Sequence, residues 1–155
     1  IEDLGLEEWN QFLSINLTSA FLLTRAVLPG MRTRGYGRIV NLASVAGRSI
    51  SEISNLHYST AKAAILGFTR KLAFEEAANG ITLNAVAPGT VFTDRVRTRY
   101  EALPEAEQAR RLEEIPMQRA ARPEEIAAVI LFLASDDASY MTGACLDVNG
   151  GRFMS

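Results

Sequence analysis

The chain has 155 residues, 48% of them hydrophobic, which is enough for one domain with a buried core and excludes a disordered chain. Its 16 basic and 18 acidic residues give a net charge of −2, so the composition offers no surface for nucleic acid. The single cysteine, Cys145, excludes an internal disulfide, and the sequence contains no cluster of metal ligands. We expect Cys145 to be a small buried residue.

Neither the apolar segments nor the N-terminus indicate a membrane or secreted protein. The longest apolar run, 126–134, has nine residues, whereas a transmembrane helix needs about 20. The first ten residues are acidic and lack the basic region of a signal peptide. These features predict a cytoplasmic protein without membrane contact. The chain begins with Ile1 rather than Met, just before a predicted helix, which is typical of the later part of a longer protein.

Long segments with helical apolar spacing alternate with short apolar segments typical of buried strands. In chain order, the predicted elements are a helix over 6–34, a strand over 38–44, a helix over 57–79, a strand over 81–87, helices over 104–114 and 122–135, and a strand over 145–148. The first helix has apolar residues at helical spacing, among them Leu6, Leu23 and Val27. Gly80 suits the end of the second helix, and Pro123 suits the first turn of the last.

This order predicts an α/β fold. Strands that are apolar throughout and alternate with long helices are typical of a parallel sheet covered by helices on both faces. Three strands make a thin sheet, and the first strand is expected to leave one open edge.

Polar residues follow the first two predicted strands and open the helix between them. Ser44 ends the first strand, Pro88 and Gly89 follow the second, and Tyr58 and Lys62 open the helix in the segment HYSTAK. In open α/β sheets, sites form at the carboxyl ends of the strands, so we expect these residues to meet in one crevice. Tyr58 and Lys62, four residues apart, lie on one helix face.

These residue types suit acid–base chemistry at a carbonyl. A free tyrosine titrates near ~10, and a neighbouring lysine cation favours the phenolate, so the pair can act as a general acid or base nearer neutral pH. A serine hydroxyl can hold a carbonyl or alkoxide oxygen. No side chain donates hydride, so reduction of a ketone at this site implies a nicotinamide cofactor.

Five segments together resemble the short-chain dehydrogenase/reductase family, in particular its β-ketoacyl-acyl-carrier-protein reductase-like branch. They are INLTSAF, GRIVNLASVAG, YSTAK, ITLNAVAPGTVFTD and YMTGACLDVNGG, and they extend over nearly the whole chain. The resemblance implies a Rossmann-type doubly wound parallel sheet and an NAD- or NADP-dependent oxidoreductase. It also implies a carbonyl or alcohol substrate, carrier-bound acyl groups among the candidates, and a homodimer or homotetramer with interfaces on the helices 6–34 and 57–79 and at the last strand.

The resemblance also implies roles for individual positions. Tyr58 corresponds to the catalytic acid/base, Lys62 to the lysine that tunes it and binds the nicotinamide ribose, and Ser44 to the residue that orients the carbonyl. Asn16 corresponds to an asparagine that holds a relay water. The residues that match the cofactor-contacting loop are Pro88, Gly89, Val91 and Thr93, and residues 95–121 match a segment that covers the substrate.

The chain departs from the family pattern at its start. The glycine-rich T-G-x-x-x-G-x-G turn that holds the cofactor pyrophosphate is absent, as is the N-N-A-G segment. We therefore expect 1–155 to form a partial domain that lacks the N-terminal half, and with it the residue that selects NAD or NADP.

The sequence also allows other functions. The chain can be a catalytically silent fragment that only self-associates or binds a partner. Ser44, His57 and Asp147 suggest a hydrolase triad, but the sequence has no G-x-S-x-G motif, and we expect His57 to start a helix near the substrate entrance. Asn16 begins a glycosylation sequon, and Ser44 can be a simple cap. The arginines Arg95, Arg97 and Arg99 are expected on a solvated face, with a contact to phosphate or an acidic carrier as the alternative.

Overall fold

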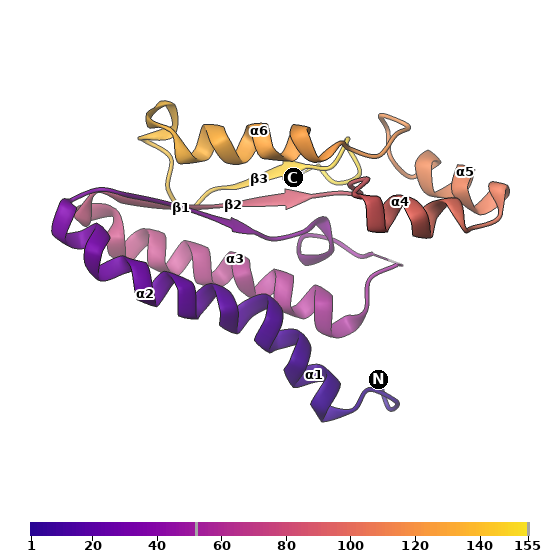
Figure 1. Ribbon diagram of the computed structural model, residues 1–155, viewed down its shortest axis with the longest axis horizontal. Helices are drawn as coiled ribbons and strands as arrows, with labels where there is room; N and C mark the ends of the chain where they lie inside the picture. The colour runs from indigo at the N-terminus through magenta and orange to yellow at the C-terminus, as the bar shows by residue number, and fades with distance from the viewer. Residues whose placement is uncertain (52, 155) are drawn as a thin grey trace.

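The computed structural model describes residues 1–51 and 53–154, which form a three-layer arrangement of helices, sheet and helix (Figure 1). The described residues form one three-stranded sheet with the order β1-β2-β3 (β1 Gly37–Leu42, β2 Ile81–Pro88, β3 Cys145–Val148). Both pairings are parallel, with Gly37 opposite Ile81 and Ala85 opposite Cys145. The predicted α/β fold and its three strands are confirmed.

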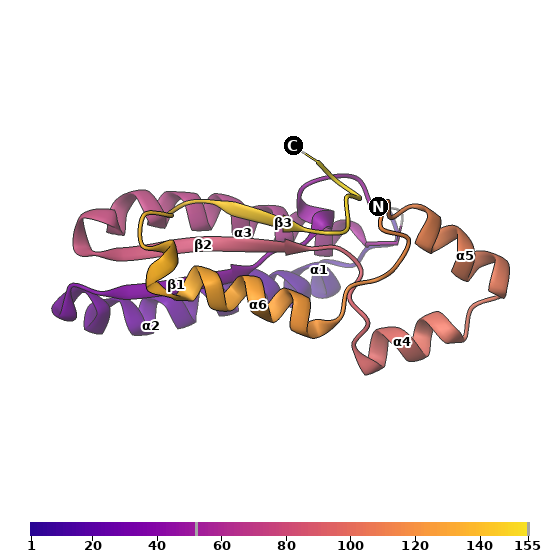
Figure 2. The ribbon, with the colours of Figure 1, turned by 90° about the horizontal axis from the view of Figure 1, so that it is seen from above.

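The central strand explains why its sequence is apolar throughout. Every residue of β2 is buried, because strands flank it on both sides and helices cover both faces. On one face lie α2 (Ser19–Arg34) and α3 (Leu56–Glu76), and on the other lies α6 (Pro123–Ala134), as Figures 1 and 2 show. Ile65 and Leu66 of α3 pack beneath the sheet, while Ile126 and Leu133 of α6 pack above it.

Local sequence sets the ends of the covering helices. After α3, a short 3-10 turn (Ala77–Asn79) leads to Gly80, whose left-handed backbone has φ 71°, a conformation that favours glycine. At the start of α6, Pro123 occupies the first turn, and the Glu125 carboxylate accepts a hydrogen bond of 2.8 Å from the Arg122 N–H.

The predicted helix over 6–34 has a different build from a single α-helix. It consists of α1 (Leu6–Leu13), a π-helical turn over Ser14–Thr18, and α2. Thr24 and Leu28 are its buried residues, whereas Leu6 and Leu23 are 73% and 69% exposed. By length and composition alone Leu6–Arg34 could cross a membrane, but this is weak evidence, since a helix that packs on a protein core passes the same test.

The segment 95–121 contains one helix more than predicted. In addition to α5 (Glu105–Glu113), the expected helix, α4 covers Asp94–Glu101. Alternating arginines leave α4 without an apolar stripe in the sequence, so the periodicity gave no signal. The observed start signal is Thr93, whose hydroxyl accepts a hydrogen bond from the Val96 N–H at 3.4 Å.

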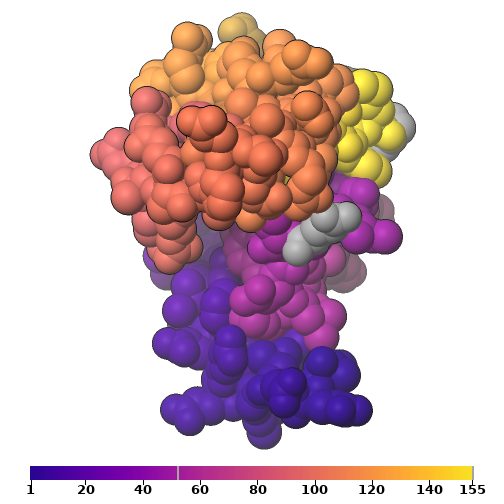
Figure 3. Space-filling model, turned by 90° about the vertical axis from the view of Figure 1, so that its right-hand side faces the viewer, coloured from indigo at the N-terminus to yellow at the C-terminus, as the bar shows by residue number. Residues whose placement is uncertain are grey.

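Helices α4 and α5 project beyond the carboxyl ends of the strands (Figures 1 and 2). Seen from that end in Figure 3, the 94–125 region lies above, the segment leading into α3 lies in the middle, and α1 lies below. This end of the sheet is where the sequence placed the candidate site.

Candidate active site

Lys62 lies in the second turn of α3 and is anchored to the sheet. Its Nζ donates a hydrogen bond of 2.8 Å to the carbonyl oxygen of Leu42, the last residue of β1. Burial lowers the pKa of the Lys62 ammonium from its usual value of 10.5, since desolvation disfavours the charged form. The lysine is therefore held at the carboxyl end of β1, with further N–H donors for another acceptor.

Tyr58 lies one helical turn before Lys62 on the same face, as the spacing predicted. The Lys62 Nζ is 5.6 Å from the centroid of the Tyr58 ring, which places the cation over the aromatic face. Tyr58 is half-buried, and within the described residues its hydroxyl has no hydrogen-bond partner. A phenol beside a cation and without a protein acceptor is available to a bound molecule.

Ser44 lies two residues beyond β1 and is buried. Its Oγ accepts a hydrogen bond of 3.2 Å from the Ala46 N–H and so caps a 3-10 turn over Val45–Gly47. The capping role considered for Ser44 is thus observed, but it uses only the oxygen as acceptor. The hydroxyl proton is still able to donate to a substrate oxygen.

Gly47 brings this turn against α3. A Cβ placed on Gly47 would lie 2.5 Å from the Lys62 carbonyl carbon and 2.6 Å from the Ala63 nitrogen, distances that real Cβ atoms do not show. The absence of a side chain therefore lets the turn that follows Ser44 touch the helix backbone at Lys62. Gly47 ends the GRIVNLASVAG motif, which predicted no role for it, although a glycine between a strand and a helix is a signal of close backbone approach.

Asn16 lies in the π-helical turn and shares a cleft with Lys62. The Asn16 Nδ2 donates a hydrogen bond of 3.0 Å to the Phe12 carbonyl oxygen of α1. Both Asn16 and Lys62 line a cleft of about 360 Å³ beside β1, together with Leu23 and Val27. The structure thus brings Asn16 to the same side of the sheet as the lysine, and π-turns recur at functional sites.

The predicted cofactor loop follows β2. Pro88 is the last residue of β2, and the Gly89 N–H donates a hydrogen bond of 3.0 Å to the Val148 carbonyl oxygen of β3. Val91 forms an isolated parallel bridge with Ala121, and Thr93 caps α4. Within the described residues, no hydrogen bond or ion pair joins these four residues to Tyr58 or Lys62.

His57 lies at the start of α3, as predicted, but it is buried, and among the described residues it forms no triad with Ser44 and Asp147. It is 3% exposed and packs edge-on against Phe12 of α1, with ring centroids 3.8 Å apart. Its Nε2 lies 3.5 Å from a Glu8 carboxylate oxygen. Asp147 instead accepts hydrogen bonds of 2.8 and 3.2 Å from Arg48. The cause is a contact between segments distant in the sequence: α1 packs against the start of α3 and covers the histidine.

Comparison with known proteins identifies the family. The family described as enoyl-(acyl carrier protein) reductase matches residues 1–152. The chain belongs to the short-chain dehydrogenase/reductase family. It is 45% identical to acetoacetyl-CoA reductase of Shinella zoogloeoides over 95% of this chain and 59% of that protein. It is 46% identical to 3-oxoacyl-acyl-carrier-protein reductase of Pseudomonas aeruginosa over 96% of this chain and 58% of that protein.

Solved structures of the family show the same fold. A 3-oxoacyl-acyl-carrier-protein reductase from Brucella melitensis superposes with a TM-score of 0.93 at 39% identity, covering 100% of this chain and 56% of that one. A Brucella melitensis structure of such a reductase with bound NAD superposes with a TM-score of 0.88 at 38% identity, covering 100% of this chain and 55% of that one. The chain therefore spans less than two thirds of the length of these short-chain dehydrogenase/reductase relatives.

Proposed function

We propose that this chain carries the acid–base half of an NAD(P)-dependent oxidoreductase that interconverts a carbonyl and an alcohol. The observation that carries the proposal is the Tyr58 hydroxyl, which has no partner within the described residues and lies on the same helix face as a half-buried, anchored Lys62. Ser44 is held in the turn that Gly47 packs against that same helix backbone. These three groups from two segments are the minimum for protonating and orienting a carbonyl oxygen.

Each residue has a distinct role in the proposed reaction. Ser44 donates its hydroxyl proton to the substrate oxygen and fixes its position, since its Oγ is already oriented by the Ala46 N–H. Tyr58 gives its proton to the same oxygen during reduction and takes it back during oxidation. Lys62 supplies positive charge that stabilises the phenolate left behind. Asn16, in the cleft that Lys62 also lines, holds a water through which the proton is replaced.

The chain's residues fit one end of a nicotinamide dinucleotide. Lys62 retains donors for ribose hydroxyls. A Cβ added to Gly89 would lie 2.9 Å from the Asn149 Cα, so the loop after Pro88 packs directly against the residue that follows β3. We assign the following residues to that end: Tyr58, Lys62, Pro88, Gly89, Val91 and Thr93. When bound, the nicotinamide supplies or accepts the hydride. The glycine-rich turn that binds pyrophosphate is not in this sequence, so the choice of NAD or NADP is left open.

The substrate class is proposed from the relatives. They are named for the reduction of acetoacetyl-CoA and of 3-oxoacyl-acyl-carrier-protein, and this chain is 45% and 46% identical to one of each. Both named compounds are 3-oxoacyl thioesters. We infer that a 3-oxoacyl thioester is the substrate here, carried by coenzyme A or by a carrier protein.

A second function follows from the open edge of β1. The chain spans 59% of the length of a relative, and β1 pairs only with β2 among the described residues. The alternative is therefore a chain that is silent alone and acts by associating with a second copy or another polypeptide.

A titration of the purified chain with NADH and NADPH, combined with an acetoacetyl-CoA reduction assay, separates the two functions. We expect Tyr58→Phe to lower kcat by about 10²- to 10⁴-fold, because it removes the proton donor. Lys62→Met should weaken nicotinamide binding as well. Tyr140→Phe is the matched control, since Tyr140 is fully exposed at 104%.

The two outcomes are distinct. Reduction that Tyr58→Phe leaves intact would contradict the proposed site. An absence of both binding and reduction, in a chain that folds, would favour the silent alternative.

A further inference from the structure

A small cavity lies among the helices beyond the sheet, apart from the Asn16 cleft. It has a volume of about 180 Å³, and its apolar wall is formed by Ile53, Val96, Leu112 and Ile115. These residues come from the segment before α3, from α4, from α5 and from the residues after α5. The Tyr100 hydroxyl donates a hydrogen bond of 2.9 Å to the Gln108 carbonyl oxygen, which holds α4 and α5 together around the cavity.

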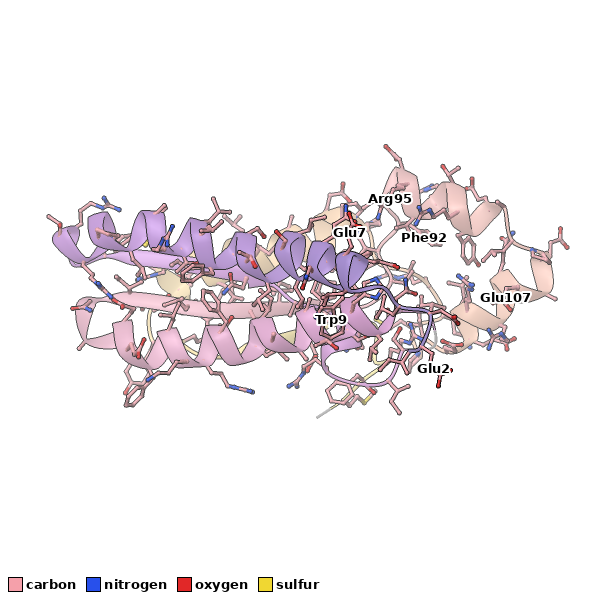
Figure 4. All side chains as sticks on the ribbon, turned by 90° about the horizontal axis from the view of Figure 1, so that it is seen from below. Glu2, Glu7, Trp9, Phe92, Arg95 and Glu107 are labelled. Carbon is pink, nitrogen blue, oxygen red and sulfur yellow. The ribbon has the colours of Figure 1, made fainter. Side chains whose placement is uncertain are left out.

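Three arginines and one glutamate also line this cavity. Arg152 donates to Glu114 at 2.6 Å, and Arg111 donates to Glu107 at 2.9 Å, so both cations are neutralised. Figure 4 labels Glu107 on α5, across from α4. Arg99 differs from the other two, because it has no carboxylate partner among the residues that the structure describes. The cavity thus has apolar residues in its wall and one exposed guanidinium, that of Arg99, without a carboxylate partner among the described residues.

We propose that this cavity binds the apolar chain of an anionic compound, and that Arg99 binds its carboxylate or phosphate group. Apolar walls favour a short alkyl or acyl chain, and a guanidinium with free donors matches the geometry of either anion. A neutral compound of the same length leaves Arg99 without a partner. The cavity therefore selects for a negatively charged group as well as for an apolar chain.

The position of the cavity connects it to the proposed reaction. Ile53 belongs to the segment between Ser44 and Tyr58, and Thr90, which also lines the cavity, directly follows Gly89. Both segments that carry the site residues therefore contribute to the cavity wall. The identification of the bound compound as the substrate rests on the proposed function, with Arg99 as a specificity-determining residue; the existence of the anion site does not.

Methyl NMR of the chain, titrated with hexanoate, hexyl phosphate and hexanol, tests the proposal without any cofactor. We expect the two anions to shift the methyl signals of Val96, Leu112 and Ile115. Arg99→Gln should weaken both anions about five-fold at low salt, as for an accessible ion pair, and leave hexanol unchanged. Arg95→Gln is the matched control, because Arg95, labelled in Figure 4, has the same charge and lies on the same helix but is not among the residues that line the cavity.

Several results would overturn the proposal. They are an absence of shifts at these methyls, equal binding of hexanol and the anions, or equal effects of Arg95→Gln and Arg99→Gln. A preference for hexyl phosphate over hexanoate, or the reverse, supports the anion site and identifies which anion it binds. Anion binding with intact Arg99 dependence in a chain that fails to reduce acetoacetyl-CoA would reject the proposed function alone.

Discussion

At the scale of single residues, Gly47 controls the geometry of the candidate site more directly than any residue to which the motifs gave a role. The atoms that a Cβ at position 47 would meet belong to the backbone of α3, at Lys62 and Ala63. Backbone cannot move aside as the end of a flexible side chain can. Any side chain at this position must push the turn carrying Ser44 away from Tyr58 and Lys62.

We expect Gly47→Ala to destabilise the chain by about 2 kcal/mol through overpacking. Gly67→Ala, on α3 with nothing within 4 Å of a new Cβ, should instead stabilise it by up to about 1 kcal/mol through helix propensity. Urea unfolding measures both variants. Equal stabilities for the two would show that the close contact at Gly47 does not constrain the fold.

The same residues show how far sequence reasoning reaches. The spacing of Tyr58 and Lys62 placed both on one helix face, and the structure has them there. The burial of His57 could not be predicted, because α1, which covers it, begins at Leu6, and the contact with Phe12 leaves no local pattern. Arg99 is exposed, as the sequence predicted, and only the fold shows that it also lines a cavity.

At the scale of elements, an ion pair between Arg32 and Glu76 ties α2 to α3. Glu76 is 1% exposed and accepts hydrogen bonds from Arg32 and Asn79, while the Arg32 side chain is 52% exposed. Because the glutamate is buried and the arginine is half-exposed, removing one partner should destabilise the chain more than removing the other. Without arginine the carboxylate remains buried and unpaired, but without glutamate the arginine can be hydrated.

Arg32→Met should therefore lower the free energy of unfolding by about 3 kcal/mol, and Glu76→Gln should lower it by about 1 kcal/mol. Hydrogen bonds from Arg32 lower the pKa of Glu76 below its usual 4.5, so the native state binds this proton less readily than the unfolded state. The stabilisation is complete above pH 4.5 and is lost as the pH falls below it. The free energy of unfolding of both variants, measured from about pH 7 to about pH 3, tests these expectations. A larger loss of stability for Glu76→Gln than for Arg32→Met would contradict the proposed asymmetry.

Elements with an apolar stripe were predicted, and elements without one were not. α3, α6 and all three strands follow the expected pattern, because their sequences face the core on a regular period. α4 was not predicted, since its alternating arginines leave no apolar stripe in the sequence and its start depends on one capping hydroxyl. The exposure of Leu23 and Val27 has a different cause, which is their position beside the open edge of the sheet.

At the scale of the whole molecule, apolar surface gathers along the open edge of the sheet. Leu23 and Val27 line the cleft beside β1, and Leu42 at the end of β1 is 51% exposed. An unpaired strand edge next to apolar side chains favours association with another chain. The helical stripe of 6–34 is thus divided between the core and this edge.

We expect the isolated chain to self-associate through this edge. Light scattering at about 100 μM should give a mass above the 16.9 kDa of one chain, because apolar surface of this kind drives association at such concentrations. Leu23→Asp should reduce the association. Leu131→Asp is the control, since Leu131 is equally exposed at 72% but lies on α6 across the sheet. A stable monomer, or equal effects of the two variants, would count against the β1 edge.

The π-helical turn at Ser14–Thr18 has a consequence for how α1 is oriented. Each residue of an α-helix turns the chain by about 100°, so one residue more or less in this turn would rotate α1 by that angle about the axis of α2. Phe12 would then leave the His57 ring, and Trp9, which lies on the side of α1 near α3 in Figure 4, would turn toward solvent. The orientation of the first helix, and with it the cover over the segment that begins at Tyr58, thus depends on a count of residues rather than on their identity.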